Sequence, residues 1–253
     1  AWRARRQAKT CLVGSNPTPS ARHRHSGISG QGLPDGGDGM VEVDGAQRSG
    51  SGTIVRTAAA LTALLGQDLH VTNVRARREE PGLRPQHLRA LEAVAELCAA
   101  RLDGARVGSR EFTLRAARRP EGGRYHWDIG SAGSTTLLAL TVLPVAAFAS
   151  EPSVFRIEGG LFQDFAPSAF HLQHVVLPTL RAMGLRAEVE ILRPGYVPKG
   201  GGILEVRVEP VEGALRPLQL VEPGQVLRVW GIALSSHLQQ RRVSERMAER
   251  CAA

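Results

Sequence analysis

An alternation of strands and helices occurs twice along this chain of 253 residues. In both copies a Gly-rich turn leads into a Thr or Ser where the first helix is expected to begin, at Gly52-Thr53 and at Gly133-Ser134. Ser and Thr are preferred at this position because their side chains accept hydrogen bonds from the first helical amides. The same order with the same turn predicts a duplicated fold of the α/β (α+β) class, built from β-α-β-α-β units of about 80 residues each.

The apolar spacing places the elements of both units. In the first unit we expect a strand at 41–44, a helix at 53–65, a strand at 70–75, a helix at 86–102 and a strand at 107–115. In the second unit we expect a strand at 124–129, a helix at 134–149, a strand at 153–158, a helix at 168–183, and strands at 186–192 and 203–209.

These elements suggest four segments. We expect the first repeat at 40–122, the second at 123–214, and in 215–253 the truncated start of a small inserted domain, with a strand at 226–233 and a helix at 238–251. Residues 1–39 are rich in Arg, Gly, Ser and Pro, so we expect a disordered leader, either a transit peptide or upstream sequence that is not native.

The segment from Asn73 to His87 has the features of an anion site. Pro81 and Pro85 restrict the backbone, so little conformational entropy remains to be lost on binding a ligand. Arg75 and Arg77 follow a strand, and Gln86-His87 open a helix, which brings guanidinium groups to a helix N-terminus. This combination favours phosphate. A loop with solvated arginines is the alternative.

Two further loops strengthen the phosphate reading. The Gly/Ser-rich segment 44–56 leads into a helix whose first turn carries Arg56, yet it lacks the Gly-Lys-Ser/Thr ending of a P-loop. The loop 193–202 sets Lys199, one of two lysines in the chain, beside three glycines before an alternating strand. A tight hairpin between two strands explains that second loop equally well.

Several of these motifs, in this order, resemble the RNA 3'-terminal phosphate cyclase family between about Met40 and Cys251. The matching motifs are Val-Glu-Val-Asp-Gly at 41–45, Arg-Ala-Arg-Arg at 75–78, Pro-Gly-Leu-Arg-Pro-Gln-His at 81–87, Gly-Ser-Ala-Gly-Ser-Thr at 130–135, Ala-Pro at 166–167 and Gly-Tyr-Val-Pro-Lys-Gly-Gly-Gly at 195–202.

The resemblance implies ATP-dependent conversion of an RNA 3'-phosphate to a 2',3'-cyclic phosphate with Mg²⁺ or Mn²⁺, through an adenylylated histidine and an adenylylated RNA end. It also implies repeats whose four-stranded sheet is backed by two helices, as in the C-terminal domain of translation initiation factor 3. The positions that match phosphate and RNA-end contacts are Arg56, Arg75, Arg77, Gln86 and His87, and Pro167 matches a proline that packs on adenine.

The chain also departs from the family pattern. The nucleophilic histidine belongs to a C-terminal segment beyond Ala253, so we assign no catalytic residue and expect an incomplete chain. Ser49 replaces a metal-associated acidic residue, so no metal ligand is assigned. Thr53 and Leu140 replace glutamines, the latter a nucleotide contact.

Composition limits the function without choosing it. The net charge is +8, but residues 1–39 hold six Lys or Arg against two Asp, so half of the excess lies in the leader. Three isolated cysteines indicate neither a disulfide framework nor a zinc site, and we expect a cytoplasmic protein. The apolar run 135–149 is too short to span a membrane and contains Pro144, which favours a buried helix.

Three functions therefore remain open. The chain is a cyclase or its N-terminal portion acting on RNA 3'-phosphate ends, a non-catalytic relative that binds RNA in ribosome assembly or RNA processing, or a structural fragment without activity. The arginine-rich motifs favour the first, and the changed polar positions favour the second.

Overall fold

The computed structural model describes residues 39–115, 119–222 and 224–252. These residues fall into two compact units, one ending at Leu218 and the other beginning at Gln219. Except for Gly39, the expected disordered leader lies outside the described residues.

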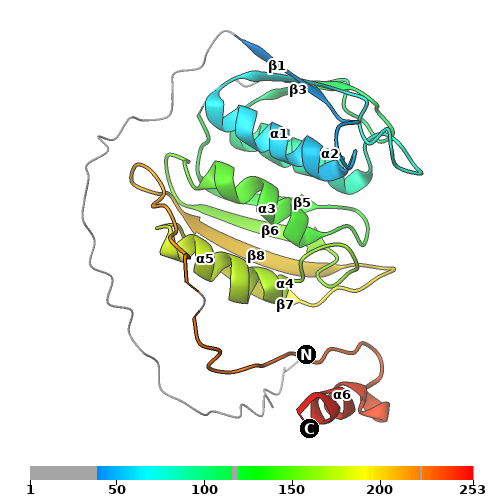
Figure 1. Cartoon of the computed structure of the whole chain (residues 1–253). Coiled ribbons are helices and arrows are strands. Elements are labelled where there is room, and N and C mark those ends of the chain that lie inside the picture. The colour runs from blue at the N-terminus through cyan, green and yellow to red at the C-terminus, as the bar shows by residue number, and fades with distance from the viewer. Residues whose placement is uncertain (1–38, 116–118, 223, 253) are drawn as a thin grey trace. The chain divides into compact units, whose positions relative to one another are not determined.

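The first sheet has four strands in the order β1-β2-β4-β3, with β1 parallel to β2 and the other two pairs antiparallel. Two helices connect the strands and pack on one face of the sheet (Figure 1). The elements are β1 Met40–Asp44, α1 Gly52–Leu65, β2 Asp68–Thr72, α2 Pro85–Leu97, β3 Arg101–Asp103 and β4 Phe112–Arg115.

The second sheet repeats this topology in the order β5-β6-β8-β7, again with one parallel pair followed by two antiparallel pairs. The elements are β5 Gly123–Asp128, α3 Thr135–Ala146, β6 Ser153–Gly159, α4 Ala169–His171, the π-helical segment η1 Leu172–Val176, α5 Leu177–Ala182, β7 Arg186–Arg193 and β8 Gly202–Glu209. The expected mixed α/β fold with an internal repeat is confirmed. Each repeat ends in two strands, however, where one was expected in the first.

The extra strand comes from a helix that ends early. The helix expected at 86–102 stops at Leu97, because Ala99 adopts a left-handed φ of 45° and the amide of Ala100 bonds back to the carbonyl oxygen of Ala95 at 2.8 Å. This termination uses neither Gly nor Pro, so the usual residues that signal a helix end are missing here. The strand expected at 107–115 is correspondingly short and begins at Phe112.

Other expected boundaries also need correction. The strand expected at 70–75 is β2, which ends at Thr72 because Asn73 has a φ of 50°. The helix expected at 168–183 is interrupted by η1, and the helix expected at 134–149 ends at Ala146.

The unit from Gln219 to Ala252 contains the 3-10 turn η2 Gln239–Arg241 and helix α6 Val243–Ala252. The strand expected at 226–233 does not form, because no described strand pairs with it, and Val226 and Val229 are 82% and 91% exposed. The helix expected at 238–251 is confirmed from Val243 onward.

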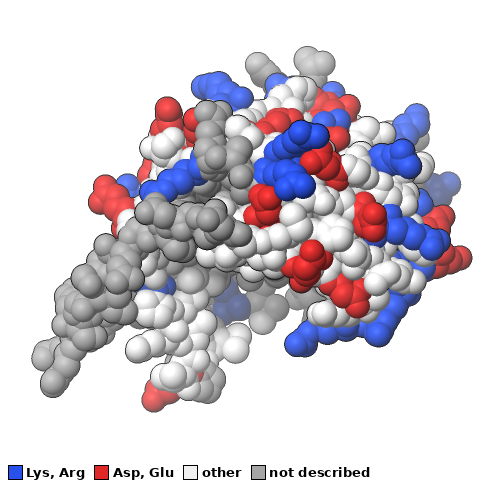
Figure 2. All heavy atoms as spheres, turned by 90° about the horizontal axis from the view of Figure 1, so that it is seen from above, with Lys and Arg blue, Asp and Glu red and all other residues white. Residues whose placement is uncertain are grey.

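Both sheets have one apolar and one charged face. The buried faces carry Leu69, Val71 and Leu114 in the first sheet and Phe155, Ile157 and Leu204 in the second, and these belong to a single core that includes α1, α2 and α3. On the opposite face of the first sheet, Arg115 forms an ion pair with Asp68 at 3.2 Å. Basic and acidic side chains are interspersed on the side of the molecule seen in Figure 2. We see no single-sign surface there that would bind a polyanion.

A hydrogen bond joins the two repeats through this core. The indole Nε1 of Trp127, on β5, donates to Oε2 of Glu96, on α2, at 2.7 Å. Trp127 is 1% exposed, so water cannot readily replace Glu96 as the acceptor of its N–H. The bond therefore fixes how the first repeat packs on the second.

Replacing Glu96 by Ala should lower the free energy of unfolding by about 1–3 kcal/mol, because the buried indole N–H loses a charged acceptor. Replacing Glu92, which pairs at the surface with Arg89 at 2.9 Å on the same helix, should cost about 1 kcal/mol or less. Urea denaturation of both variants checks this difference. Equal losses would show that the bond to Trp127 contributes no more than a surface ion pair.

Candidate functional site

The N-termini of three helices meet at the carboxyl ends of the parallel strands. Ser51 caps α1, α2 begins at Pro85, and Ser134 caps α3. The side-chain oxygen of Gln86 accepts from the backbone amide of Ser134 at 3.1 Å, which ties α2 to α3 across the two repeats. Because helix N-termini carry unpaired amides and partial positive charge, this convergence favours an anion.

The loop before α1 is held in place by side-chain contacts. Oδ1 of Asp44 accepts from the backbone amide of Ala46 at 2.9 Å and from the amide side chain of Asn73 at 3.1 Å. Ser51, rather than the expected Thr53, caps the helix, and its Oγ accepts from the amide of Thr53 at 3.4 Å. The backbone at this helix end is thus fixed before any ligand arrives.

Arg56 is a buried cation on the first turns of α1. The residue is 8% exposed, and burial lowers the pKa of its guanidinium to about 10, so it remains charged at neutral pH. Its one hydrogen bond to a described residue is a long contact of 3.5 Å from Nη2 to Oγ1 of Thr53. No described carboxylate lies within 4.0 Å of it, so no described acidic side chain balances its charge.

His87 lies at the start of α2 and is 4% exposed. Its Nδ1 accepts from the backbone amide of Arg84 at 3.2 Å, so the neutral ring carries its proton on Nε2. Burial first, and then the charges of Arg56, Arg75 and Arg84, lower its pKa to about 3. His87 is therefore a neutral hydrogen-bond donor at physiological pH.

Gly52 explains how α1 and α2 come so close. A Cβ on Gly52 would lie 2.1 Å from Nε2 of His87, which is closer than any real contact. The proton-bearing nitrogen of His87 is thus placed against the first residue of α1, beside the helix amides. Sequence analysis placed Gly52 in the Gly-rich turn before the helix but did not predict its close approach to His87.

Arg75 and Arg77 brace the loops around the site. Nη1 of Arg75 donates to the carbonyl oxygens of Glu80 and Gly82 at 2.7 and 2.8 Å. Nη1 of Arg77 donates to the carbonyl oxygen of Arg48 at 2.8 Å, which clips the loop after β2 to the loop after β1. Both arginines keep other guanidinium nitrogens without a described partner.

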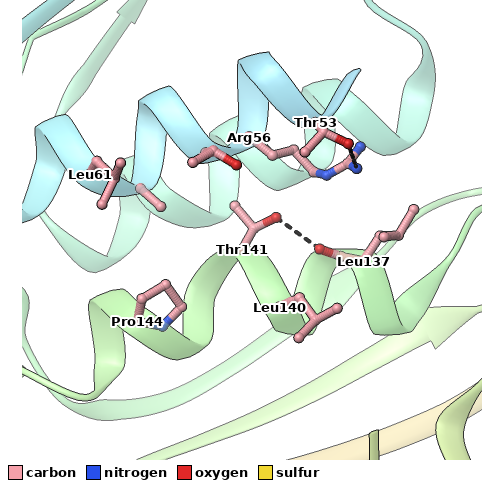
Figure 3. A pocket seen from close by; sticks show the side chains of 9 residues that line it. Thr53, Arg56, Leu61, Leu137, Leu140, Thr141 and Pro144 are labelled. Atoms are coloured by element: carbon pink, nitrogen blue, oxygen red, sulfur yellow. Dashed lines mark hydrogen bonds between the residues drawn. The ribbon is translucent and has the colours of Figure 1, made fainter. Parts of the chain in front are cut away.

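A pocket of about 250 Å³ opens between α1 and α3, and Arg56 lines it (Figure 3). Residues on α1 and on α3 recur at helical spacing along facing sides of the two helices. The lining residues are Thr53, Arg56, Thr57, Ala60, Leu61, Leu137, Leu140, Thr141 and Pro144. Sequence analysis did not predict that Thr57, Leu61, Thr141 and Pro144 line a pocket, although their i, i+3, i+4 spacing marks one face of each helix.

Pro167 does not line this pocket. Its carbonyl oxygen accepts from Oγ1 of Thr136 at 2.6 Å, which holds the loop after β6 against the N-terminal turn of α3. The loop between β7 and β8 reaches the same edge, because a Cβ on Gly200 would lie 2.8 Å from Cα of Ala132.

The loop after β1 carries hydroxyl side chains at Ser49 and Ser51. Among the described residues there is no group of three or more His, Cys, Asp or Glu side chains that could hold one. Oγ of Ser49 donates to Oγ of Ser51 at 3.1 Å, and hydroxyl groups alone are poor ligands for Mg²⁺.

No described helix has the length and apolar character needed to cross a membrane.

Fold and site together define a protein of duplicated, helix-backed sheets with a cationic site where helix N-termini converge. A profile of the RNA 3'-terminal phosphate cyclase family matches residues 47–248. The chain belongs to this family, which confirms the resemblance found in its motifs.

Relatives agree with this assignment. The RNA 3'-terminal phosphate cyclase of Pseudomonas fluorescens is 43% identical over 215 residues, 82% of this chain and 61% of the relative. That of Desulfurococcus amylolyticus is 41% identical over 198 residues, 78% of this chain and 54% of the relative. The chain thus spans a little over half the length of these two relatives.

Among solved structures, the enolpyruvyl transferase NikO from Streptomyces tendae is similar at a TM-score of 0.36 and 16% identity, covering 63% of this chain and 29% of that one. This similarity is too low to support any inference about the chain.

Acid should destabilise the folded protein through His87. The pKa of His87 in the folded state is about 3, below the ordinary histidine value of 6.5, so the unfolded state binds the proton first as the pH falls. Between about pH 6 and pH 3, His87 should lower the free energy of unfolding by up to about 1.4 kcal/mol per pH unit. Urea denaturation should show a shallower pH dependence in His87→Asn, which does not titrate. Identical pH dependence in both proteins would contradict a buried neutral His87.

Gly52→Ala separates helix propensity from packing. Propensity alone would favour Ala by up to about 1 kcal/mol, but the 2.1 Å clash with His87 should dominate and destabilise the protein. The double variant Gly52→Ala, His87→Ala should recover part of the loss, because the clashing ring is gone. If the double variant instead loses the sum of the two single losses of stability in thermal unfolding, the two residues are not in contact.

Proposed function

We propose that the protein binds the 3'-phosphate end of RNA at this site and acts in its ATP-dependent conversion to a 2',3'-cyclic phosphate. The observation that carries the proposal is Arg56, a buried guanidinium that lines a pocket and has no described carboxylate partner. A buried charge is costly unless something compensates it, so such a residue is best explained by an anionic ligand.

The neighbouring groups suit a terminal phosphate. Three kinds of hydrogen-bond donor lie near Arg56: Nε2–H of His87, the unused N–H groups of Arg75 and the first-turn amides of α1. None of these groups has to gain a proton in order to bind an anion. A terminal phosphate monoester carries up to two negative charges near neutral pH and accepts several hydrogen bonds. We assign Arg77 and Gln86 to positioning, because each holds a site loop or helix end through its own hydrogen bond.

ATP is the second polyanion that the family resemblance implies. We propose that Pro167 packs on its adenine, at the loop that Thr136 holds against α3. Bringing ATP and an RNA phosphate together requires neutralisation of charge, which the site offers through arginine and helix amides. We propose that Mg²⁺ or Mn²⁺, which the resemblance also implies, enters with the nucleotide, whose phosphate oxygens are suitable ligands for it.

A second candidate is binding without catalysis, in ribosome assembly or RNA processing. Two observations favour it: Ser49 stands where the family has an acidic residue, and Leu140 lines the pocket where the family has a nucleotide-contacting glutamine.

For the finer fold, we propose that each repeat resembles the C-terminal domain of translation initiation factor 3. We also propose repeats at 40–122 and 123–214, an inserted domain beginning at 215, and a cytoplasmic location.

RNA ending in a 3'-phosphate should bind more tightly than the same RNA ending in a hydroxyl, by about 1–3 kcal/mol. Arg56→Met should abolish this preference while leaving the free energy of unfolding unchanged or about 1–3 kcal/mol higher, because a buried charge is replaced by a packed thioether. Arg89→Met, which removes a surface arginine on α2, should keep the preference. Fluorescence anisotropy and urea denaturation measure the two effects.

Equal affinity of the unmodified protein for both RNAs would overturn the proposal and favour a fragment without activity. A destabilised Arg56→Met variant would instead assign Arg56 a structural role. Because no residue of the printed sequence is assigned as the adenylylated histidine, ATP binding rather than product formation separates the two candidates. Binding of ATP together with 3'-phosphorylated RNA supports the cyclase, and RNA binding without ATP binding supports the non-catalytic relative.

A further inference from the structure

Aromatic residues are few in this chain and are unevenly placed. The sequence contains three Trp, two Tyr and six Phe. Phe112, Trp127 and Phe155 are buried in the core, and Tyr125 and Phe148 pack against it. Phe162, Phe165, Phe170 and Tyr196 instead lie in or beside the loops that follow β6 and β7. More than a third of the aromatic residues therefore gather at one edge of the second sheet.

Three of these rings and one imidazole form a continuous series of ring contacts, which we call the aromatic column (Tyr196, Phe162, Phe170 and His174). Ring centroids are 5.3 Å apart between Tyr196 and Phe162, and 5.4 Å apart between Phe162 and Phe170. The column continues from Phe170 to His174 at 6.3 Å with an interplanar angle of 14°. The rings of Phe162 and Phe170 and those of Phe170 and His174 are stacked, whereas the planes of Tyr196 and Phe162 are tilted by 31°. Spacings of this size are favourable between aromatic rings.

The aromatic column is not explained by the hydrophobic core. Phe162 packs against the core, whereas Phe170 and Tyr196 are half-buried and do not belong to it. The hydroxyl of Tyr196 has no hydrogen-bond partner among the described residues, although partial burial raises its pKa. Phe165 is fully exposed and holds a φ of 61°, a left-handed conformation that is costly for a bulky residue.

A short series of contacts links the column to the cationic site. Gln86 accepts from the amide of Ser134, and Ser134 forms a β-bridge with Gly160. The amide of Leu161, next to Phe162, donates to the carbonyl oxygen of Gly195, next to Tyr196, at 3.0 Å. Lys199 is exposed in the same loop as Tyr196. Aromatic rings, a lysine and the phosphate-directed residues thus share one edge of the sheet.

We propose that Phe165 and the aromatic column form a stacking platform for the bases of single-stranded RNA whose 3' end occupies the cationic site. Aromatic side chains that flank a cationic groove are a general solution for holding single strands, because every base offers a π face. The proposal rests on the proposed function for the position of the RNA end, and it adds an independent requirement for bases upstream of that end.

The test compares a short 5'-labelled oligoadenylate with the same strand carrying abasic nucleotides, both measured by fluorescence anisotropy against the whole chain. The unmodified protein should bind the base-bearing strand more tightly. Phe165→Leu and Tyr196→Leu should each weaken that binding by about 5-fold to 100-fold, the effect of losing one stacked base, and should leave binding of the abasic strand unchanged.

Two control variants test whether the ring itself is responsible. Tyr196→Phe keeps the ring and should bind normally. Val197→Ser removes an exposed apolar side chain that is 62% exposed in the same loop, and it should also bind normally. Since Phe165 makes no core contact, Phe165→Leu should melt like the unmodified protein, which keeps the test independent of folding.

Equal binding of base-bearing and abasic strands by the unmodified protein, or normal binding by both leucine variants, would overturn the platform. So would a loss of affinity that is equal for both strands, which would indicate a damaged loop or a surface for a protein partner. Each strand is also measured with a 3'-phosphate and a 3'-hydroxyl. A preference for bases without a preference for the phosphate would support the platform and refute the proposed function, and the reverse result would do the opposite.

Discussion

The packing of α1 and α2 on α3 is the constraint on which the rest of the structure depends. It joins the apolar faces of two sheets into one core, so neither repeat has to bury its helices alone. In a β-α unit the helix begins where the strand ends, and shared packing therefore brings the N-termini of helices from both repeats to a common edge. The hydrogen bonds from Trp127 to Glu96 and from Ser134 to Gln86 fix that arrangement at two separate points.

The electrostatics of the site follow from this packing. Burial lowers the pKa of Arg56 without discharging it, and it lowers the pKa of His87 far enough to keep the imidazole neutral. The two side chains therefore differ in charge although both are buried close to helix N-termini. Arg56 presents a fixed cation to the pocket between α1 and α3, and His87 places a neutral donor against Gly52 at the start of α1. No described carboxylate pairs with Arg56. The free-energy cost of that arrangement is what a bound anion would offset.

Helices and strands were predicted well where the apolar spacing of the sequence matches the face that is buried in the fold. They were predicted poorly where their ends depend on contacts with distant segments. The helix that contains Arg56 and the strands of the second repeat follow from apolar spacing. In these elements the apolar residues recur at the period of the helix or strand, and they are the residues that become buried. The helix that contains His87 was expected to continue beyond Leu97, since Ala99 is not a usual helix terminator. The strand that follows it, β3, forms by pairing with the distant β4, which the local sequence does not indicate. Residues 226–233 have a strand-like pattern, but a strand requires a neighbour, and no described segment supplies one.

The sequence by itself determined the duplicated fold, the family and the identity of the charged residues near the site. These depend on periodicity and on short motifs, which are local properties of the chain. Tertiary structure alone decided what those residues do: Arg75 and Arg77 brace loops, Gln86 joins two repeats, and Arg56 stands unpaired in a pocket. It also decided that Gly52 must be glycine, because the clash with His87 arises between residues 35 positions apart. Charge partners, burial and close approach are set by which surfaces meet, and a linear pattern does not contain that information.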